Sequence, residues 1–87
     1  MNVCGTRVSE SRNKLGLSQS DLCGRLATVT NGEWIGDRRD IYRIEKGTRK
    51  IADVELLALA LALEVSPLWL LVGNKDERAE TGFSSIQ

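Results

Sequence analysis

The sequence predicts a small all-α domain of five short helices followed by a tail. Its 87 residues, 41% of them hydrophobic, suffice for one globular domain with a modest core. Most apolar residues recur at spacings of three and four, the helical period, and glycine or Ser/Asp capping residues divide the chain into pieces of helical length. We therefore expect the domain to occupy residues 1–73 and a polar tail to occupy residues 74–87.

The first two predicted helices are separated by Gly16, because glycine tolerates the left-handed conformation at a helix end. The face of the first helix follows spacings of four, four and three. That face consists of Cys4, Val8, Arg12 and Leu15. Ser18 is expected to cap the second helix, with Asp21 three residues later in a capping-box arrangement. The predicted buried face of the second helix consists of Leu22, Cys23 and Leu26.

The third helix is predicted to start after Asp37, which is a good cap with an acid, Asp40, at the third position. The helix ends at Gly47 and turns Ile41 and Ile44 inward. Residues 28–36, which precede it, include two glycines, an asparagine and an isolated Trp34. We expect a long connection there, with room for one extra turn of the second helix. Packing of Trp34 over the domain is favoured over an exposed contact surface.

The fourth segment alternates like a strand over residues 59–63, but its composition favours a helix. Residues 55–64 contain strong helix formers and no β-branched residue. We therefore predict a helix there, capped by Asp53. Ser66 and Pro67 open a fifth short helix, since proline suits the first helical position, and Gly73 closes it.

Charge and cysteine content limit the function classes. Lys+Arg and Asp+Glu number 12 each, which argues against a general polyanion binder. However, residues 38–50 contain six bases and two acids, which is typical of one nucleic-acid-facing edge. With no histidine and no CxxC spacing, Cys4 and Cys23 are expected in the core, not at a metal. We expect no enzyme, cofactor or metal site, because catalytic motifs are absent from the sequence.

A membrane segment is not expected. The longest apolar run, residues 56–63, is too short to span a bilayer, and the chain does not open with a basic-then-apolar leader. A cytoplasmic location is the resulting expectation.

Three motifs in one order resemble the phage-repressor (Cro-like, XRE-type) helix-turn-helix family. They are Leu15-Gly16-Leu17-Ser18-Gln19-x-x-Leu22, Ile41-x-x-Ile44-Glu45-x-Gly47-x-Arg49, and the pattern from Leu56 to Leu70. The resemblance covers residues 7–73 and implies a compact five-helix, lambda-repressor-like DNA-binding domain. It implies a prokaryotic or phage transcription regulator, most simply a repressor. The chain departs from the family between helices 2 and 3, where the connection is enlarged by about eight residues relative to a short turn.

The resemblance also assigns DNA contacts residue by residue. Gln19, in the first turn of the second helix, would bind a backbone phosphate, although an ordinary exposed position is the alternative. Arg38 and Arg39 would lie first on the recognition helix, and arginine is the usual bidentate reader of guanine. The remaining assigned contacts are Tyr42 and Arg43 to a base edge, thymine methyl or phosphate, and Thr48, Arg49 and Lys50 to the backbone.

Two further expectations concern the architecture. The resemblance implies a partly buried ion pair between Arg12 and Glu45 that orients the recognition helix; two exposed charges are the alternative. A single short recognition helix reads few base pairs, so we expect a homodimer on a palindromic operator of double-stranded DNA. The candidate dimer surface is formed by Val65, Leu68, Trp69 and Val72. Alternatively, Trp69 and Leu70 complete the core.

A protein-interaction module is the competing hypothesis. The chain would then be an antitoxin-like protein or a phage regulator that acts through a partner bound at the Trp34 loop. Burial of Arg38 and Arg39 in salt bridges would disable base reading and favour this alternative. A DNA reader needs both side chains exposed along one edge.

Overall fold

The computed structural model describes residues 3–73 of the chain. These residues form five α-helices joined by loops and contain no strand. The helices are α1 (Gly5–Lys14), α2 (Gln19–Val29), α3 (Arg38–Lys46), α4 (Asp53–Leu63) and α5 (Pro67–Val72). The all-α prediction is therefore confirmed. The predicted tail, residues 74–87, lies outside the described residues.

Local capping explains where three of the helices begin. The Ser18 hydroxyl accepts the Asp21 N–H, and the Asp21 carboxylate accepts the Ser18 N–H, both at 2.9 Å. At the start of α3, the Asp37 carboxylate accepts the Arg39 N–H and the Asp40 carboxylate accepts the Asp37 N–H, both at 2.9 Å. Ser66 caps α5, with Pro67 in its first turn. These predicted starts are confirmed, because each depends only on residues a few positions apart.

The start of α4 differs from its prediction. Asp53 is the first residue of the helix, and Ala52 occupies the cap position. Alanine has no side-chain acceptor, so the support comes from Glu55, whose carboxylate accepts the Ala52 N–H at 3.0 Å. The predicted cap Asp53 is thus displaced one residue into the helix.

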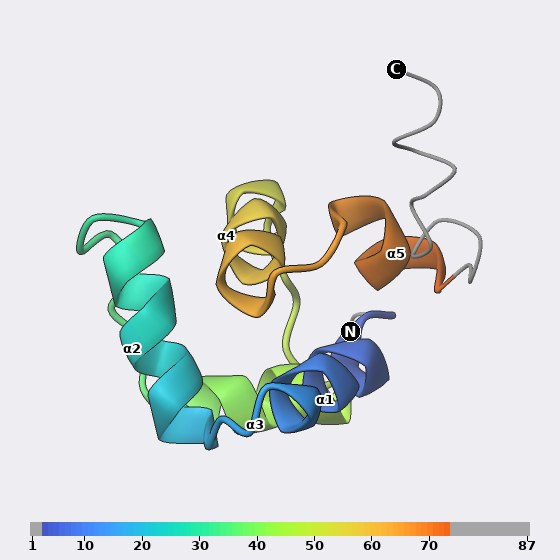
Figure 1. The fold of residues 1–87 in the computed structure, drawn as a ribbon, viewed down its shortest axis with the longest axis horizontal. Coiled ribbons are helices and arrows are strands. Elements are labelled where there is room, and N and C mark those ends of the chain that lie inside the picture. The colour runs from blue at the N-terminus through green and yellow to red at the C-terminus, as the bar shows by residue number, and fades with distance from the viewer. Residues whose placement is uncertain (1–2, 74–87) are drawn as a thin grey trace.

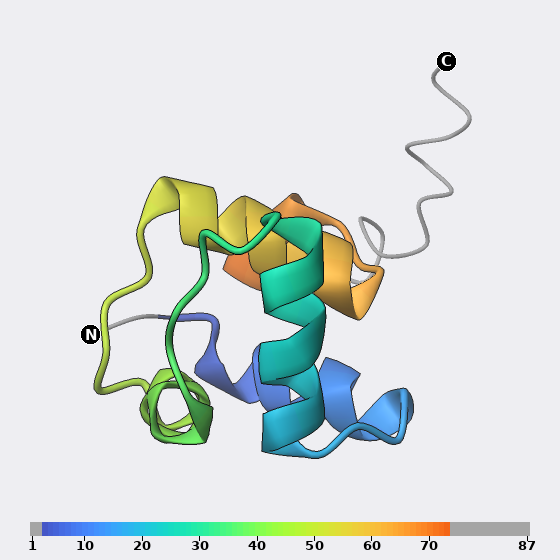
Figure 2. The same ribbon diagram turned by 90° about the vertical axis from the view of Figure 1, so that its left-hand side faces the viewer.

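The helices form two groups around one core. α3 packs against α1 and α2, while α4 packs against α2, α1 and α5. Figures 1 and 2 show α1 and α3 at one end of the molecule and α4 and α5 at the other, with α2 reaching between them. The largest fully buried side chains are Val8, Leu22, Leu26, Ile41, Ile44, Leu59, Leu63 and Leu70.

Two residues of the predicted core lie nearer the surface than expected. Leu15 follows the last residue of α1 and is exposed, because the chain already turns there towards Gly16. Cys23 is partly buried at the edge of the core, whereas Cys4 is buried, and neither forms a disulfide. Desolvation of the partly buried Cys23 thiol raises its pKa.

The connection between α2 and α3 folds back along α2 (Figure 2). Asn31 and Gly32 both have positive φ, a conformation that these two residue types tolerate, and the chain reverses there. Trp34 anchors the segment that returns along α2. Its side chain is largely buried, with the residue 9% exposed, and its backbone N–H donates to the Thr30 hydroxyl at 2.9 Å. The predicted packing of Trp34 is confirmed. As a result, α3 begins beside the first turn of α2, where Ser20 lines one hollow with Arg38 and Arg39.

Candidate nucleic-acid interface

The outer face of α3 is built by two buried isoleucines. Ile41 and Ile44 are completely buried against α1 and α2. Side chains three and four positions apart share a helix face, so the side chains two and five positions from Ile41 or Ile44 lie on the opposite side. The exposed residues on that side are Arg38, Arg39, Tyr42, Arg43 and Lys46. All four predicted contact residues of this helix therefore share one solvent-facing surface.

The two leading arginines are not buried in salt bridges. Arg38 is exposed and has no ion pair within residues 3–73. Arg39 contacts the Asp37 carboxylate at 3.1 Å, but its side chain is 77% exposed. An ion pair in this setting is weak and readily exchanged for another acceptor. Both guanidinium groups are therefore accessible to a ligand.

The next turn of α3 carries a second pair of exposed groups. The Lys46 ammonium lies 5.5 Å from the centre of the Tyr42 ring, within cation–π range. Arg43 donates to Asp40 at 3.1 Å while its side chain stays largely exposed. The surface thus presents cations with one aromatic ring among them.

Gln19 is tied to α3 through the ion pair beneath it. Arg12 contacts Glu45 at 2.6 and 3.1 Å and also donates to the Leu17 carbonyl at 2.7 Å. The Arg12 and Glu45 side chains are 12% and 9% exposed, so the structure brings the predicted pair together at a mostly buried position. The Gln19 amide donates to the same Glu45 carboxylate at 3.1 Å. Because an amide has two N–H donors and a carbonyl, Gln19 keeps capacity for another partner beside Tyr42, with which it lines a hollow.

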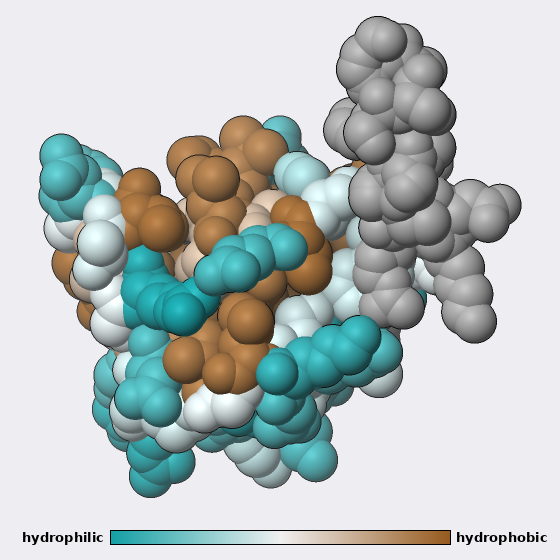
Figure 3. Space-filling view, in the orientation of Figure 1, coloured by the Kyte–Doolittle hydropathy of each residue, from teal (hydrophilic) through white to brown (hydrophobic). Residues whose placement is uncertain are grey.

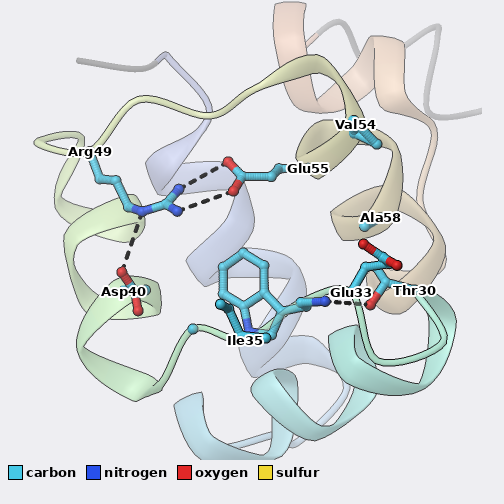
Figure 4. Close-up of a pocket in the computed structure, with 10 residues that line it drawn as sticks. Thr30, Glu33, Ile35, Asp40, Arg49, Val54, Glu55 and Ala58 are labelled. Atoms are coloured by element: carbon cyan, nitrogen blue, oxygen red, sulfur yellow. Dashed lines mark hydrogen bonds and ion pairs between the residues drawn. The ribbon is translucent and has the colours of Figure 1, made fainter.

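The residues after α3 divide into two kinds. Thr48 and Lys50 are exposed. Arg49, predicted to bind phosphate with them, instead turns towards the protein: it donates to Glu55 at 3.0 and 3.1 Å and lies 3.4 Å from Asp40 (Figure 4). Its side chain is 27% exposed. Two carboxylates therefore hold the Arg49 guanidinium in this structure, and its contact with the DNA backbone stays a prediction.

The electrostatics agree with this placement. The hydrogen bonds from Arg49 hold the pKa of Glu55 below its ordinary value, and the same bonds raise the pKa of Arg49. The pKa of Asp40 is lowered first by the Asp37 backbone N–H, with Arg43 and Arg49 adding to the effect. A pocket of about 460 Å³ lies against this network (Figure 4). Sequence reasoning missed the network; its only signal was an arginine six positions before an acid.

Two of the four residues of the candidate dimer surface are buried or partly buried. Trp69 is 4% exposed and belongs to the core, and Val65 packs partly buried against it. Leu68 and Val72 are exposed, and Leu71, which the prediction omitted, is exposed beside them. The solvent-exposed apolar surface of α5 therefore consists of Leu68, Leu71 and Val72.

Two kinds of site are absent from the described residues. Nowhere in residues 3–73 do three His, Cys, Asp or Glu side chains gather so that they could hold a metal ion. None of the five helices is both long and apolar enough to cross a membrane.

Two comparisons of the sequence with known proteins give no match. No protein-family model matches this chain, and none of the curated proteins matches its sequence. What the α3 surface binds must therefore be inferred from its own side chains.

Proposed function

We propose that this protein is a sequence-specific DNA-binding transcription regulator that reads the major groove with α3. The observation that carries the proposal is the outer face of α3, on which two accessible arginines lead and a tyrosine and further cations follow. An α-helix fits the major groove, and a bidentate arginine–guanine contact is worth about 1–3 kcal/mol of discrimination. The resemblance to phage-repressor helix-turn-helix proteins supports a repressor in particular.

Phosphate contacts would fix the helix in register. Gln19 lies at the N-terminus of α2, where backbone N–H groups and the helix dipole favour an anion. Lys50 and Thr48 are exposed beyond the other end of α3. Such contacts position a reading helix but carry no sequence information themselves.

Homodimer binding follows from the length of the reading helix. α3 has nine residues and spans about 13 Å, which covers only a few base pairs. Two copies on a palindrome would double the number of bases read. The exposed α5 residues Leu68, Leu71 and Val72 are the surface that we assign to the partner copy.

The proposal is tested by selection from a randomised duplex pool followed by sequencing. The wild type is expected to enrich a palindrome with half-site centres about 10 base pairs apart. The double variant Arg38→Ala/Arg39→Ala should lose that enrichment. Arg25→Ala is a suitable control, because Arg25 pairs with Glu64 and the Ala62 carbonyl away from α3. Failure of the wild type to enrich any sequence at low salt would refute the proposal.

A protein-binding module is the second candidate, and one observation favours it. Val54, Leu57 and Leu61 are exposed along one side of α4, and apolar side chains gather over α4 in Figure 3. Ile35, in the α2–α3 connection, is 90% exposed. Exposed apolar groups of this kind are typical of protein contact surfaces. A variant Leu57→Ser that abolished regulation in cells without changing DNA affinity would favour this function.

A further inference from the structure

We propose that Trp34 and Arg49 form a clamp that sets the position of α3, so that Arg49 governs base recognition without contacting DNA. This inference rests on the proposed function, and it gives the enlarged α2–α3 connection a role. Trp34 belongs to the α2–α3 connection and Arg49 to the segment after α3, and Glu55 of α4 holds Arg49 in place.

Asp40 is the point at which the clamp holds α3. One carboxylate oxygen accepts the Asp37 N–H at 2.9 Å and so closes the first turn of the helix. The other oxygen is shared by Arg43 at 3.1 Å and Arg49 at 3.4 Å. Asp40, which orders the start of α3, is therefore held by Arg49 from outside the helix. It directly follows Arg38 and Arg39, the arginines that would read bases.

Arg49 connects that start to α4. Its two terminal nitrogens contact the two oxygens of Glu55, a fork geometry that a guanidinium makes especially well. Glu55 in turn accepts the Ala52 N–H at the start of α4. One guanidinium, in the segment between α3 and α4, thus bridges the first turns of these two helices.

Trp34 is the part of the clamp against which Arg49 and Gly36 pack. The guanidinium carbon of Arg49 lies 5.6 Å from the centre of the Trp34 ring. The ring also packs tightly on Gly36: a Cβ added there would lie 2.6 Å from Trp34 Cζ2 and 2.8 Å from Asp40 Oδ2. Only glycine allows this approach, so the connection is held against both Asp40 and Arg49.

The contacts of Arg49 distinguish two roles that its place in the sequence motif allows: a contact with a DNA phosphate, and the positioning of α3. A phosphate contact contributes affinity on every sequence and adds to the salt dependence of binding. A positioning residue affects how well the reading side chains meet their bases, because misplacement of about 1 Å weakens a directional contact. Arg49 is held by two carboxylates and a ring, whereas its neighbour Lys50 is exposed.

The test compares Arg49→Gln with Lys50→Gln, which remove the same charge from adjacent positions. Affinity is measured against salt concentration for the selected duplex and for a scrambled duplex. Lys50→Gln should flatten the slope of log affinity against log salt by about 0.9 and leave the ratio between the duplexes unchanged. Arg49→Gln should leave the slope on scrambled DNA unchanged and lower the ratio about tenfold.

A second variant, Gly36→Ala, disturbs the clamp without changing charge, and it should also lower the ratio. Circular dichroism checks that each variant is folded before binding is measured. The clamp is overturned if Arg49→Gln flattens the slope as Lys50→Gln does and keeps the ratio, because Arg49 would then be a phosphate contact.

Failure of the proposed function would be recognised separately. If the wild type selects no sequence, amide hydrogen exchange of residues 38–40 tests the clamp by itself. Arg49→Gln should accelerate exchange there at least fivefold relative to Lys50→Gln, since the first turn of α3 loses its outside support. Equal exchange in the two variants would overturn the clamp.

Discussion

Gly5 is a residue whose side-chain hydrogen is required by the packing of two helices. A Cβ at this position would lie 2.6 Å from the carbonyl oxygens of Ile44 and Glu45 at the end of α3. We expect Gly5→Ala to destabilise the fold by about 1–3 kcal/mol, the usual cost of overpacking. Gly24→Ala is the matched control, because Gly24 is helical with nothing within 4 Å, and should stabilise by about 0.5–1 kcal/mol. Urea unfolding measures both; equal effects would contradict the close approach of α1 to α3.

The Arg12–Glu45 pair gives a second prediction about single residues. Arg12→Ala leaves the mostly buried Glu45 carboxylate without its main partner, which costs about 3 kcal/mol of unfolding free energy. Arg39→Ala removes an ion pair of similar length at the surface and should not measurably change stability. Chemical unfolding of the two variants is the comparison. Similar losses would mean that the Arg12 pair is not buried in solution.

At the scale of elements, the bridge from α3 to α4 makes stability depend on pH. The folded-state pKa of Glu55 is depressed by its bonds to Arg49, with Asp40 the nearby acid that opposes this. A depressed carboxyl pKa contributes stability above the unfolded-state pKa, and this stability is lost as pH falls through the folded value. We therefore expect the unfolding free energy to decline from roughly pH 5 downward. Glu55→Gln should be less stable at pH 7 and show a shallower decline, measured by urea unfolding at each pH; parallel curves would contradict the bridge.

The elements differ in how far the sequence predicts them. Starts at Ser18, Asp37 and Ser66 were predictable because each cap is completed within three residues. The start of α4 was misplaced because Glu55, not Asp53, satisfies the cap N–H. The return path of residues 30–37 was not predictable, since it depends on where Trp34 finds its packing partners.

The candidate site divides in the same way. The exposed face of α3 follows from the helical spacing of Ile41 and Ile44, which the sequence displays. The inward turn of Arg49 depends on acids brought together from α3 and α4, so no local pattern indicates it. Burial of Trp69 likewise reflects how α5 meets α4, and a six-residue helix has too few residues to show a clear apolar face.

For the whole molecule, the structure separates a basic end from an apolar end. α3 carries four exposed cations, and α4 and α5, which lie at the other end of the molecule (Figure 1), expose two apolar surfaces. We expect Val72→Glu, on α5, to reduce self-association and binding to a palindromic duplex while leaving half-site binding unchanged. Leu61→Glu, on α4, is the control and should leave the dimer intact. Sedimentation equilibrium decides: loss of the dimer in Leu61→Glu alone would transfer the interface to α4.

The central claim, that the α3 face binds DNA, is tested most directly by an NMR titration of the ¹⁵N-labelled protein with a duplex at low salt. This mapping needs no knowledge of the operator, because non-specific binding uses the same positively charged surface. We predict that the largest amide shifts fall on Gln19 and Ser20, on residues 38–46 and on Lys50. Shifts confined to α4 and α5, or no shifts at all at low salt, would contradict the claim.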